Sequence, residues 1–222
     1  MLFRSSDAKD VSLGIVSPDG RAGMLQHARE FHEAGIPFIF DPGQGLPMFN
    51  GEELLAFVRQ ADYLTVNDYE AQLLQERTGH SLVSLAQNLK ALIVTLGGKG
   101  SVIYANGKEI DIPCATPAQI VDPTGCGDSY RAGLLYGIAN GLDWELTGRL
   151  ASLIGAIKIA QRGGQKDGAP GVSQRERRAG VLPEEHVLHG DRRRIVPLDQ
   201  LGDPLVDRKS TRLNSSHVAL SR

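Results

Sequence analysis

Apolar residues follow two alternating patterns up to about residue 165, short continuous runs and longer stretches with helical spacing. The short runs are rich in β-branched and aromatic residues, which is typical of strands buried on both faces of a sheet. They predict strands over residues 11–16, 36–40, 63–66, 91–95 and 119–121. The longer stretches predict helices over residues 21–34, 51–61, 68–77, 129–140 and 145–161. Residues 101–112 alternate around Asn106-Gly107, which predicts a hairpin with a two-residue turn.

Strands that alternate with helices predict an α/β fold, in which helices cover both faces of a mostly parallel sheet. Beyond this region the pattern ends. Residues 166–222 hold 11 of the 24 lysines and arginines and have no sustained apolar period. We therefore expect one domain over residues 1–165, followed by a divergent tail over residues 166–222 that is disordered or comes from a misread frame.

The composition is that of a soluble globular protein, with 41% apolar and 23% charged residues. A formal charge of −2 gives no electrostatic reason to expect a nucleic acid or an anionic membrane as partner. The sequence has no apolar run long enough for a membrane span and no signal-peptide pattern. Its two cysteines, Cys114 and Cys126, lack metal-site spacing and predict free thiols in a reduced, cytoplasmic protein.

Three polar clusters directly follow predicted strands, at residues 67–70, 95–100 and 122–128. In open parallel sheets, ligands bind beyond the carboxyl ends of the strands. Clusters that follow three separate strands therefore indicate one shared site at that edge of the sheet.

The last of these clusters has the residues of an anion-binding turn. A helix that begins near Gly125 would present free backbone N–H groups and the positive end of its dipole, and the glycines would let a phosphate approach. Asp128 falls in the first helical turn, where a carboxylate can accept a proton from a hydroxyl that attacks phosphorus. The turn thus indicates phosphoryl transfer. An isolated Gly-x-Gly-Asp is more often a tight strand-to-helix connection, and that interpretation stays open at this point.

Three motifs together carry a resemblance to a known family. The segment Asp122-Pro-Thr-Gly-Cys-Gly-Asp-Ser-Tyr-Arg-Ala-Gly133 resembles the C-terminal signature of the ribokinase-like (PfkB) carbohydrate kinases. Thr65-Val-Asn-Asp-Tyr-Glu70 resembles the N-x-x-E motif of that family, and Thr95-Leu-Gly-Gly-Lys-Gly100 resembles its nucleotide-binding motif. Together with Asp41-Pro-Gly-Gln-Gly45, these motifs are most similar to the bacterial adenosine kinases within the family. The resemblance implies a ribokinase-like three-layer sandwich.

The resemblance implies ATP-dependent phosphorylation of a hydroxymethyl group on a nucleoside or sugar, with Mg²⁺ as the second cofactor. Asp128 would be the base that activates the acceptor hydroxyl. The backbone amides of Gly125, Cys126 and Gly127 would hold the γ-phosphate. Cys126 stands where the family usually has alanine, a change that a backbone contact should tolerate.

The same resemblance implies residues for the nucleotide and the metal. The residues implied for the nucleotide are Thr95, Gly97, Gly100, Asp122 and Thr124. Asn67 and Glu70 would organise Mg²⁺, through water or directly, since oxygen donors suit that ion. An N-cap at Asn67, with Glu70 at the third helical position, explains the same two residues without a metal.

Three functions are compatible with these motifs. The leading expectation is an adenosine kinase, and a kinase for a free sugar such as ribose or fructose is the alternative. Family members begin with further strands, a β-lid over the substrate and most of the residues that select it, and we expect that this part is missing here. A non-catalytic nucleotide-binding remnant is therefore the third possibility, and a homodimer is expected only of the full-length protein.

Overall fold

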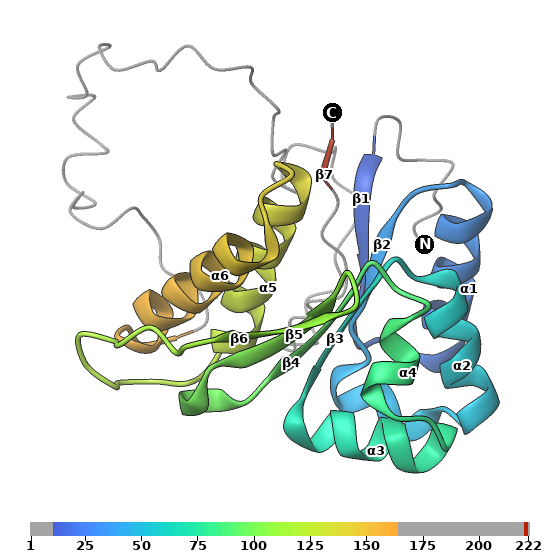
Figure 1. Cartoon of the computed structure of the whole chain (residues 1–222), viewed down its shortest axis with the longest axis horizontal. Helices are drawn as coiled ribbons and strands as arrows, with labels where there is room; N and C mark the ends of the chain where they lie inside the picture. The colour runs from blue at the N-terminus through green and yellow to red at the C-terminus, as the bar shows by residue number, and fades with distance from the viewer. Residues whose placement is uncertain (1–10, 164–219, 222) are drawn as a thin grey trace, which may run out of the picture.

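The computed structural model describes residues 11–163 and 220–221, and its centre is one sheet (Figure 1). The strands lie in the order β6-β5-β4-β3-β2-β1-β7. They are β1 (Val11–Val16), β2 (Phe38–Phe40), β3 (Tyr63–Asn67), β4 (Ala91–Thr95), β5 (Ser101–Ala105), β6 (Lys108–Ile112) and β7 (Leu220–Ser221). Strands β1 to β4 are parallel. Strand β5 pairs antiparallel with β4, β6 pairs antiparallel with β5, and β7 pairs antiparallel with β1.

Helices cover both faces of this sheet, as Figure 1 shows. The helices on one face are α1 (Arg21–Glu33), α2 (Gly51–Gln60), α3 (Asp68–Thr78) and α4 (Leu82–Ala86). The other face is covered by α5 (Cys126–Ala139) and α6 (Trp144–Ile159). Two short 3-10 helices, η2 (Gly43–Met48) and η3 (Gly97–Lys99), follow β2 and β4. The expected three-layer α/β arrangement with a mostly parallel sheet is thereby confirmed.

The apolar runs are continuous because each central strand has both of its faces buried. In β2, Phe38 and Phe40 belong to the core beneath α1 to α4, whereas Ile39 belongs to the core beneath α5 and α6. Leu64 of β3 pairs in register with Leu92 of β4, and both lie in the first core. Alternate residues of one strand therefore supply two separate cores.

One predicted strand, over residues 119–121, does not form. Ile120 is 77% exposed, and the backbone N–H groups of Val121 and Asp122 donate to Ile159 O at 2.9 and 3.1 Å. Pro117 and Pro123 flank this segment, and proline cannot donate to a sheet ladder. The segment is instead a loop against the C-terminal end of α6, so only two of the three polar clusters follow a strand.

Other boundaries differ in smaller ways from the sequence prediction. Helix α4, with five residues, is too short to reveal a helical period in the sequence. Helix α5 begins at Cys126, before the predicted start at residue 129. The prediction for the tail concerns residues outside the described part of the chain, apart from the two residues of β7.

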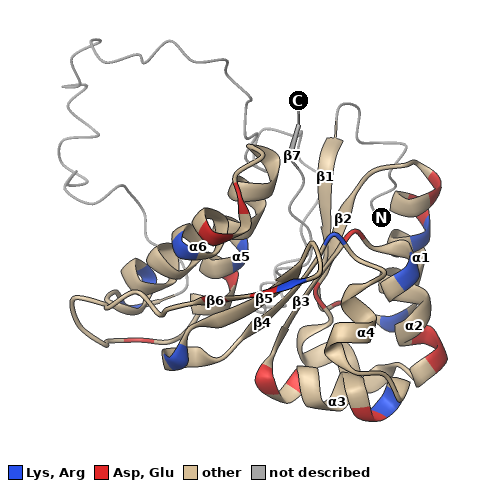
Figure 2. Ribbon diagram, viewed as in Figure 1, with Lys and Arg blue, Asp and Glu red and all other residues tan. Residues whose placement is uncertain are grey.

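Acidic and basic side chains are interspersed over α1, α2 and α3, as Figure 2 shows. Ion pairs join some of them, including Arg21 of α1 with Glu53 of α2. No helix among the described residues combines the length and the apolar character needed to cross a bilayer.

Candidate active site at the start of α5

One carboxylate and one glycine hold the turn that leads into α5. Asp122 accepts hydrogen bonds from the backbone N–H groups of Thr124 and Gly163, both at 2.9 Å. These hydrogen bonds, foremost those from Thr124, favour the charged form and lower the pKa of Asp122 to about 2. Gly125 follows with a φ of 78°, a left-handed conformation that favours glycine. Both residues therefore have a structural role, which is to fix where α5 begins.

Protonation of Asp122 should weaken this turn. Its pKa in the folded protein lies below the ordinary value of 3.8, so its stabilising effect is present above that value and is lost as the pH falls toward about 2. We expect Asp122→Ala to lower the melting temperature at neutral pH, and the difference from the unsubstituted protein to shrink between about pH 5 and about pH 3. Thermal melts across this range test the expectation. A difference that stays constant would mean that the charge of Asp122 does not stabilise the fold.

The first turn of α5 offers unused backbone donors. The N–H of Cys126 donates to Pro123 O at 3.1 Å, and the N–H of Ser129 donates to Gly125 O at 2.9 Å. Within the described part of the chain, the N–H groups of Gly127 and Asp128 have no hydrogen-bond acceptor. The amide of Cys126, which was expected to hold a phosphate, is thus already engaged, and those of Gly127 and Asp128 are available to an anion.

A cavity of about 620 Å³ lies beside this turn, between the loop after β4, the segment after β6 and α6. Five of the predicted site residues line it, namely Thr95, Gly97, Gly100, Cys126 and Gly127. Much of the remaining wall is apolar, including Pro117, Ile120, Pro123, Ala156 and Ile159. The other predicted residues of the turn, with Asn67 and Glu70, are not part of the wall. A cavity of this size and character is typical of a small-molecule site.

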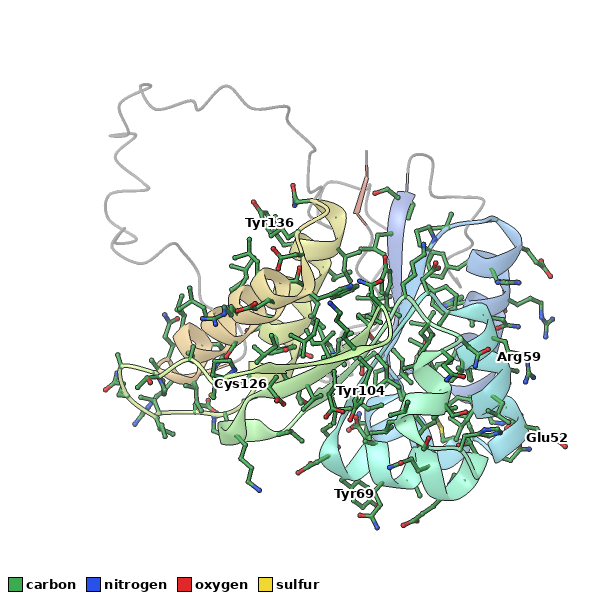
Figure 3. All side chains as sticks on the ribbon, in the orientation of Figure 1. Glu52, Arg59, Tyr69, Tyr104, Cys126 and Tyr136 are labelled. Atoms are coloured by element: carbon green, nitrogen blue, oxygen red, sulfur yellow. The ribbon has the colours of Figure 1, made fainter. Side chains whose placement is uncertain are left out.

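Cys126, labelled in Figure 3, is the first residue of α5. Burial raises the pKa of its thiol above the ordinary value. The thiol is therefore protonated at neutral pH, which does not favour a nucleophilic role.

The glycines of the loop after β4 are required by its backbone. The N–H of Leu96 donates to Gly100 O at 2.8 Å, and the N–H of Gly100 donates to Gly97 O at 3.1 Å. The φ angles of Gly97 and Gly100 are 57° and 98°, in the region that favours glycine. A Cβ at Gly100 would lie 2.1 Å from Ile112 O. The loop can therefore keep this shape beside the cavity only with glycine at position 100.

Asn67 and Glu70 form the N-terminal cap of α3. The side chain of Asn67 accepts from the N–H of Glu70, and the carboxylate of Glu70 accepts from the N–H of Asn67, both at 2.8 Å. Glu70 is buried, and the described residues contain no group of three or more metal-binding side chains. The cap therefore accounts for both residues without a metal, and their role in binding Mg²⁺ stays a prediction.

A second capping box in the protein serves as a control that distinguishes the structural role of Asn67 from a role in metal binding. Asn50 and Glu53 cap α2 in the same reciprocal way, away from the cavity. We expect Asn67→Ala and Asn50→Ala each to lower the free energy of unfolding by about 1 kcal/mol. Only Asn67→Ala should raise the Mg²⁺ concentration needed for nucleotide binding. Denaturant unfolding and Mg²⁺ titrations measure the two effects, and an equal Mg²⁺ requirement in both variants would leave Asn67 as a cap alone.

A buried ion pair joins the carboxyl end of β2 to α5. Nη2 of Arg131 donates to Oδ1 of Asp41 at 2.7 Å, and Nε lies against Oδ2. Burial raises the pKa of Asp41 to about 6, although Arg131 acts in the opposite direction. Neither residue was assigned a role from the sequence. The signal was present, since Asp41 follows a predicted strand and Arg131 lies one helical turn after Asp128.

Comparisons with known proteins agree with this geometry. Residues 5–170 match the pfkB family carbohydrate kinases. A nucleoside kinase of Methanocaldococcus jannaschii is 38% identical over 126 residues, which cover 57% of this chain and 42% of the relative. The solved structure of a Burkholderia thailandensis nucleoside kinase in complex with inosine has 52% identity and a TM-score of 0.71, over 72% of this chain and 52% of that one. An adenosine kinase of Sinorhizobium meliloti has 28% identity and a TM-score of 0.57, over 67% of this chain and 47% of that one.

The family match includes the α5 turn and the loop after β4, and the similarities to the relatives concern only part of each relative. The chain spans about half the length of the relatives that it matches. The two nucleoside kinases are more similar to it than the adenosine kinase is, so the similarity favours nucleoside kinases broadly rather than the adenosine branch. Since the family match extends over most of the chain, the protein belongs to the pfkB family of carbohydrate kinases.

Proposed function

We propose that residues 1–165 are the nucleotide-binding and catalytic part of an ATP-dependent kinase that phosphorylates a hydroxymethyl group of a nucleoside. One observation carries the proposal. The start of α5 has available backbone donors at Gly127 and Asp128, and Gly127 also lines the cavity beside the loop after β4. Phosphoryl transfer needs such fixed donors around the charge of the transferred group.

The cavity supports a position for ATP. Its apolar wall at Ile120 and Ile159 suits the flat base, and the end at Gly127 suits the phosphates. Mg²⁺ bound with ATP would neutralise part of the phosphate charge. Asn67 and Glu70 would hold that ion through water, because their side chains also form the cap of α3.

The position and exposure of Asp128 support a role as the general base. It lies in the first turn of α5 and is exposed, one residue after Gly127. In the proposed reaction its carboxylate accepts the proton of the acceptor hydroxyl while that oxygen forms a bond to the γ-phosphorus. The bond from this phosphorus to the bridging oxygen of ADP breaks, and ADP leaves.

We infer a nucleoside acceptor from the similarity to nucleoside kinases, one of them bound to inosine. Adenosine is the specific acceptor that we propose first, and a free sugar is the second candidate, favoured by the general character of the family.

We also propose that the full-length protein acts in the cytoplasm, where ATP is available and the free thiols of Cys114 and Cys126 stay reduced, and that it forms a homodimer.

Two experiments test the proposal. Isothermal titration of the 222-residue chain with MgATP should give one saturable site. For turnover, the chain would replace the matched region in a fusion with the rest of the Burkholderia thailandensis kinase, and ADP release would be measured with adenosine, inosine and ribose. We expect turnover with the nucleosides and little with ribose. Binding of MgATP without turnover by the fusion would favour a non-catalytic nucleotide-binding protein, and the absence of binding would refute the proposal.

A further inference from the structure

The guanidinium of Arg131 is fixed in place beside the proposed phosphate site. Nη2 donates to Oδ1 of Asp41, Oδ2 lies against Nε without a hydrogen bond, and the side chain of Asp41 is only 4% exposed. The side chain of Arg131 is 21% exposed, so part of it remains accessible to a ligand. One hydrogen bond and a second close contact with the same carboxylate restrict the orientation of the guanidinium as well as its position.

The third nitrogen of this guanidinium lies against Gly127. Helical side chains point back toward the N-terminus, so the side chain at position 131 covers the residue four positions earlier. A Cβ placed on Gly127 would lie only 2.6 Å from Nη1 of Arg131. Because Asp41 occupies the Nε and Nη2 edge, Nη1 is the donor turned to the phosphate-binding turn, and glycine at position 127 makes room for it.

The charges around Arg131 also distinguish it from an ordinary structural ion pair. Burial by itself would lower the pKa of Arg131. The negative charges of Asp41, Glu70 and Asp128 nevertheless raise this pKa above its ordinary value, and Asp41 contributes the most among them. Arg131 is thus the cation among three carboxylates, two of which we assign to the metal and the acceptor. A buried ion pair alone is weak evidence for added stability. A cation held beside an anion-binding turn has a clearer use in phosphate binding, since charge-assisted hydrogen bonds are the stronger ones.

We propose that Arg131 is a ligand of the terminal phosphate of the nucleotide, through Nη1, and that Asp41 is the positioning residue that aims it. This inference rests on the proposed function, since it assumes that a nucleoside triphosphate has its last phosphate at Gly127. ADP lacks that phosphate. Arg131 should therefore favour binding of the nucleoside triphosphate over the diphosphate, without contributing to binding of the base or ribose.

The test compares two ligands, MgADP and the Mg²⁺ complex of a non-hydrolysable ATP analogue with a β,γ-imido bridge, on the 222-residue chain. The first variant is Arg131→Lys, which keeps the positive charge but loses the planar fork. The second is the double variant Asp41→Asn with Arg131→Gln, which removes both charges so that neither stays buried alone. Arg149→Gln is the matched control, because Arg149 forms an exposed ion pair with Glu145 on α6.

We expect each Arg131 variant to bind the imido analogue about 10-fold to 100-fold more weakly, with a change of less than about 2-fold for MgADP. The control should bind both ligands as the unsubstituted chain does. Equal losses for both ligands, or no loss for either, in variants that still melt cooperatively would overturn the role of Arg131 and leave the proposed function standing. Failure of the unsubstituted chain to bind either nucleotide would overturn both. Should the double variant not fold, the result for Arg131→Lys decides the question.

Discussion

Asp128→Asn is expected to lower turnover of the fusion with the Burkholderia thailandensis kinase by about 10²–10⁴-fold, the typical contribution of a general base. An amide cannot accept the proton of the acceptor hydroxyl, whereas its shape is nearly that of the carboxylate. Asp128 is exposed and does not line the cavity, so the affinity for MgATP should stay within about 2-fold or tighten as a negative charge is removed. Steady-state kinetics and isothermal titration measure the two quantities.

The control for this variant is Asp143→Asn. Asp143 is also a carboxylate at a helix start, where it caps α6 by accepting from the N–H of Leu146 at 2.8 Å. Asparagine caps helices as well as aspartate does, so this change should alter neither turnover nor stability. Near-normal turnover in Asp128→Asn would remove Asp128 from the role of base. A parallel loss of MgATP affinity would instead indicate that its main effect is on the shape of the turn.

Gly100→Ala is expected to be the most destabilising single change near the site. Alanine at a φ of 98° costs about 1–3 kcal/mol as backbone strain. Its Cβ would lie 2.1 Å from Ile112 O and 2.9 Å from the backbone nitrogen of Cys114. Neither contact is with a flexible side chain, so the loop and the end of β6 must separate, at a further cost of about 1–3 kcal/mol. Because the loop lines the cavity, the affinity for MgATP should fall as well. Denaturant unfolding and nucleotide titration test both effects.

Gly98→Ala is the matched control in the same loop. A Cβ at Gly98 would meet nothing within 4 Å, and its φ is not in the left-handed region. We expect a change of less than about 0.5 kcal/mol in the free energy of unfolding. If Gly98→Ala and Gly100→Ala destabilised the protein equally, the loop would be sensitive to any side chain, and the close approach at Gly100 would not be the cause.

Much of the fold was predictable from the sequence because its central strands are buried on both faces. Continuous apolar runs such as that of β4, together with the helical spacing of the apolar residues in α1, predict a parallel sheet covered by two layers of helices. The segment 119–121 shows the limit of that reasoning. An apolar pair such as Ile120-Val121 satisfies the pattern of a strand, but only the tertiary structure decides whether a neighbouring strand is available to pair with it.

For the candidate site as well, the sequence predicted some features and only the tertiary structure decided others. The motifs themselves determined the chemistry expected at Asp128, the glycine loops and the Asn67–Glu70 cap, because each depends on residue types at short spacing along the chain. Contacts between distant segments decided the rest. Ile112 O makes Gly100 obligatory, Pro123 O occupies the amide of Cys126, and Asp41 fixes Arg131 from 90 positions away. The spacing of residues along the chain does not indicate which groups come into contact in the folded protein. Those tertiary contacts decide which backbone N–H groups stay available beside the cavity.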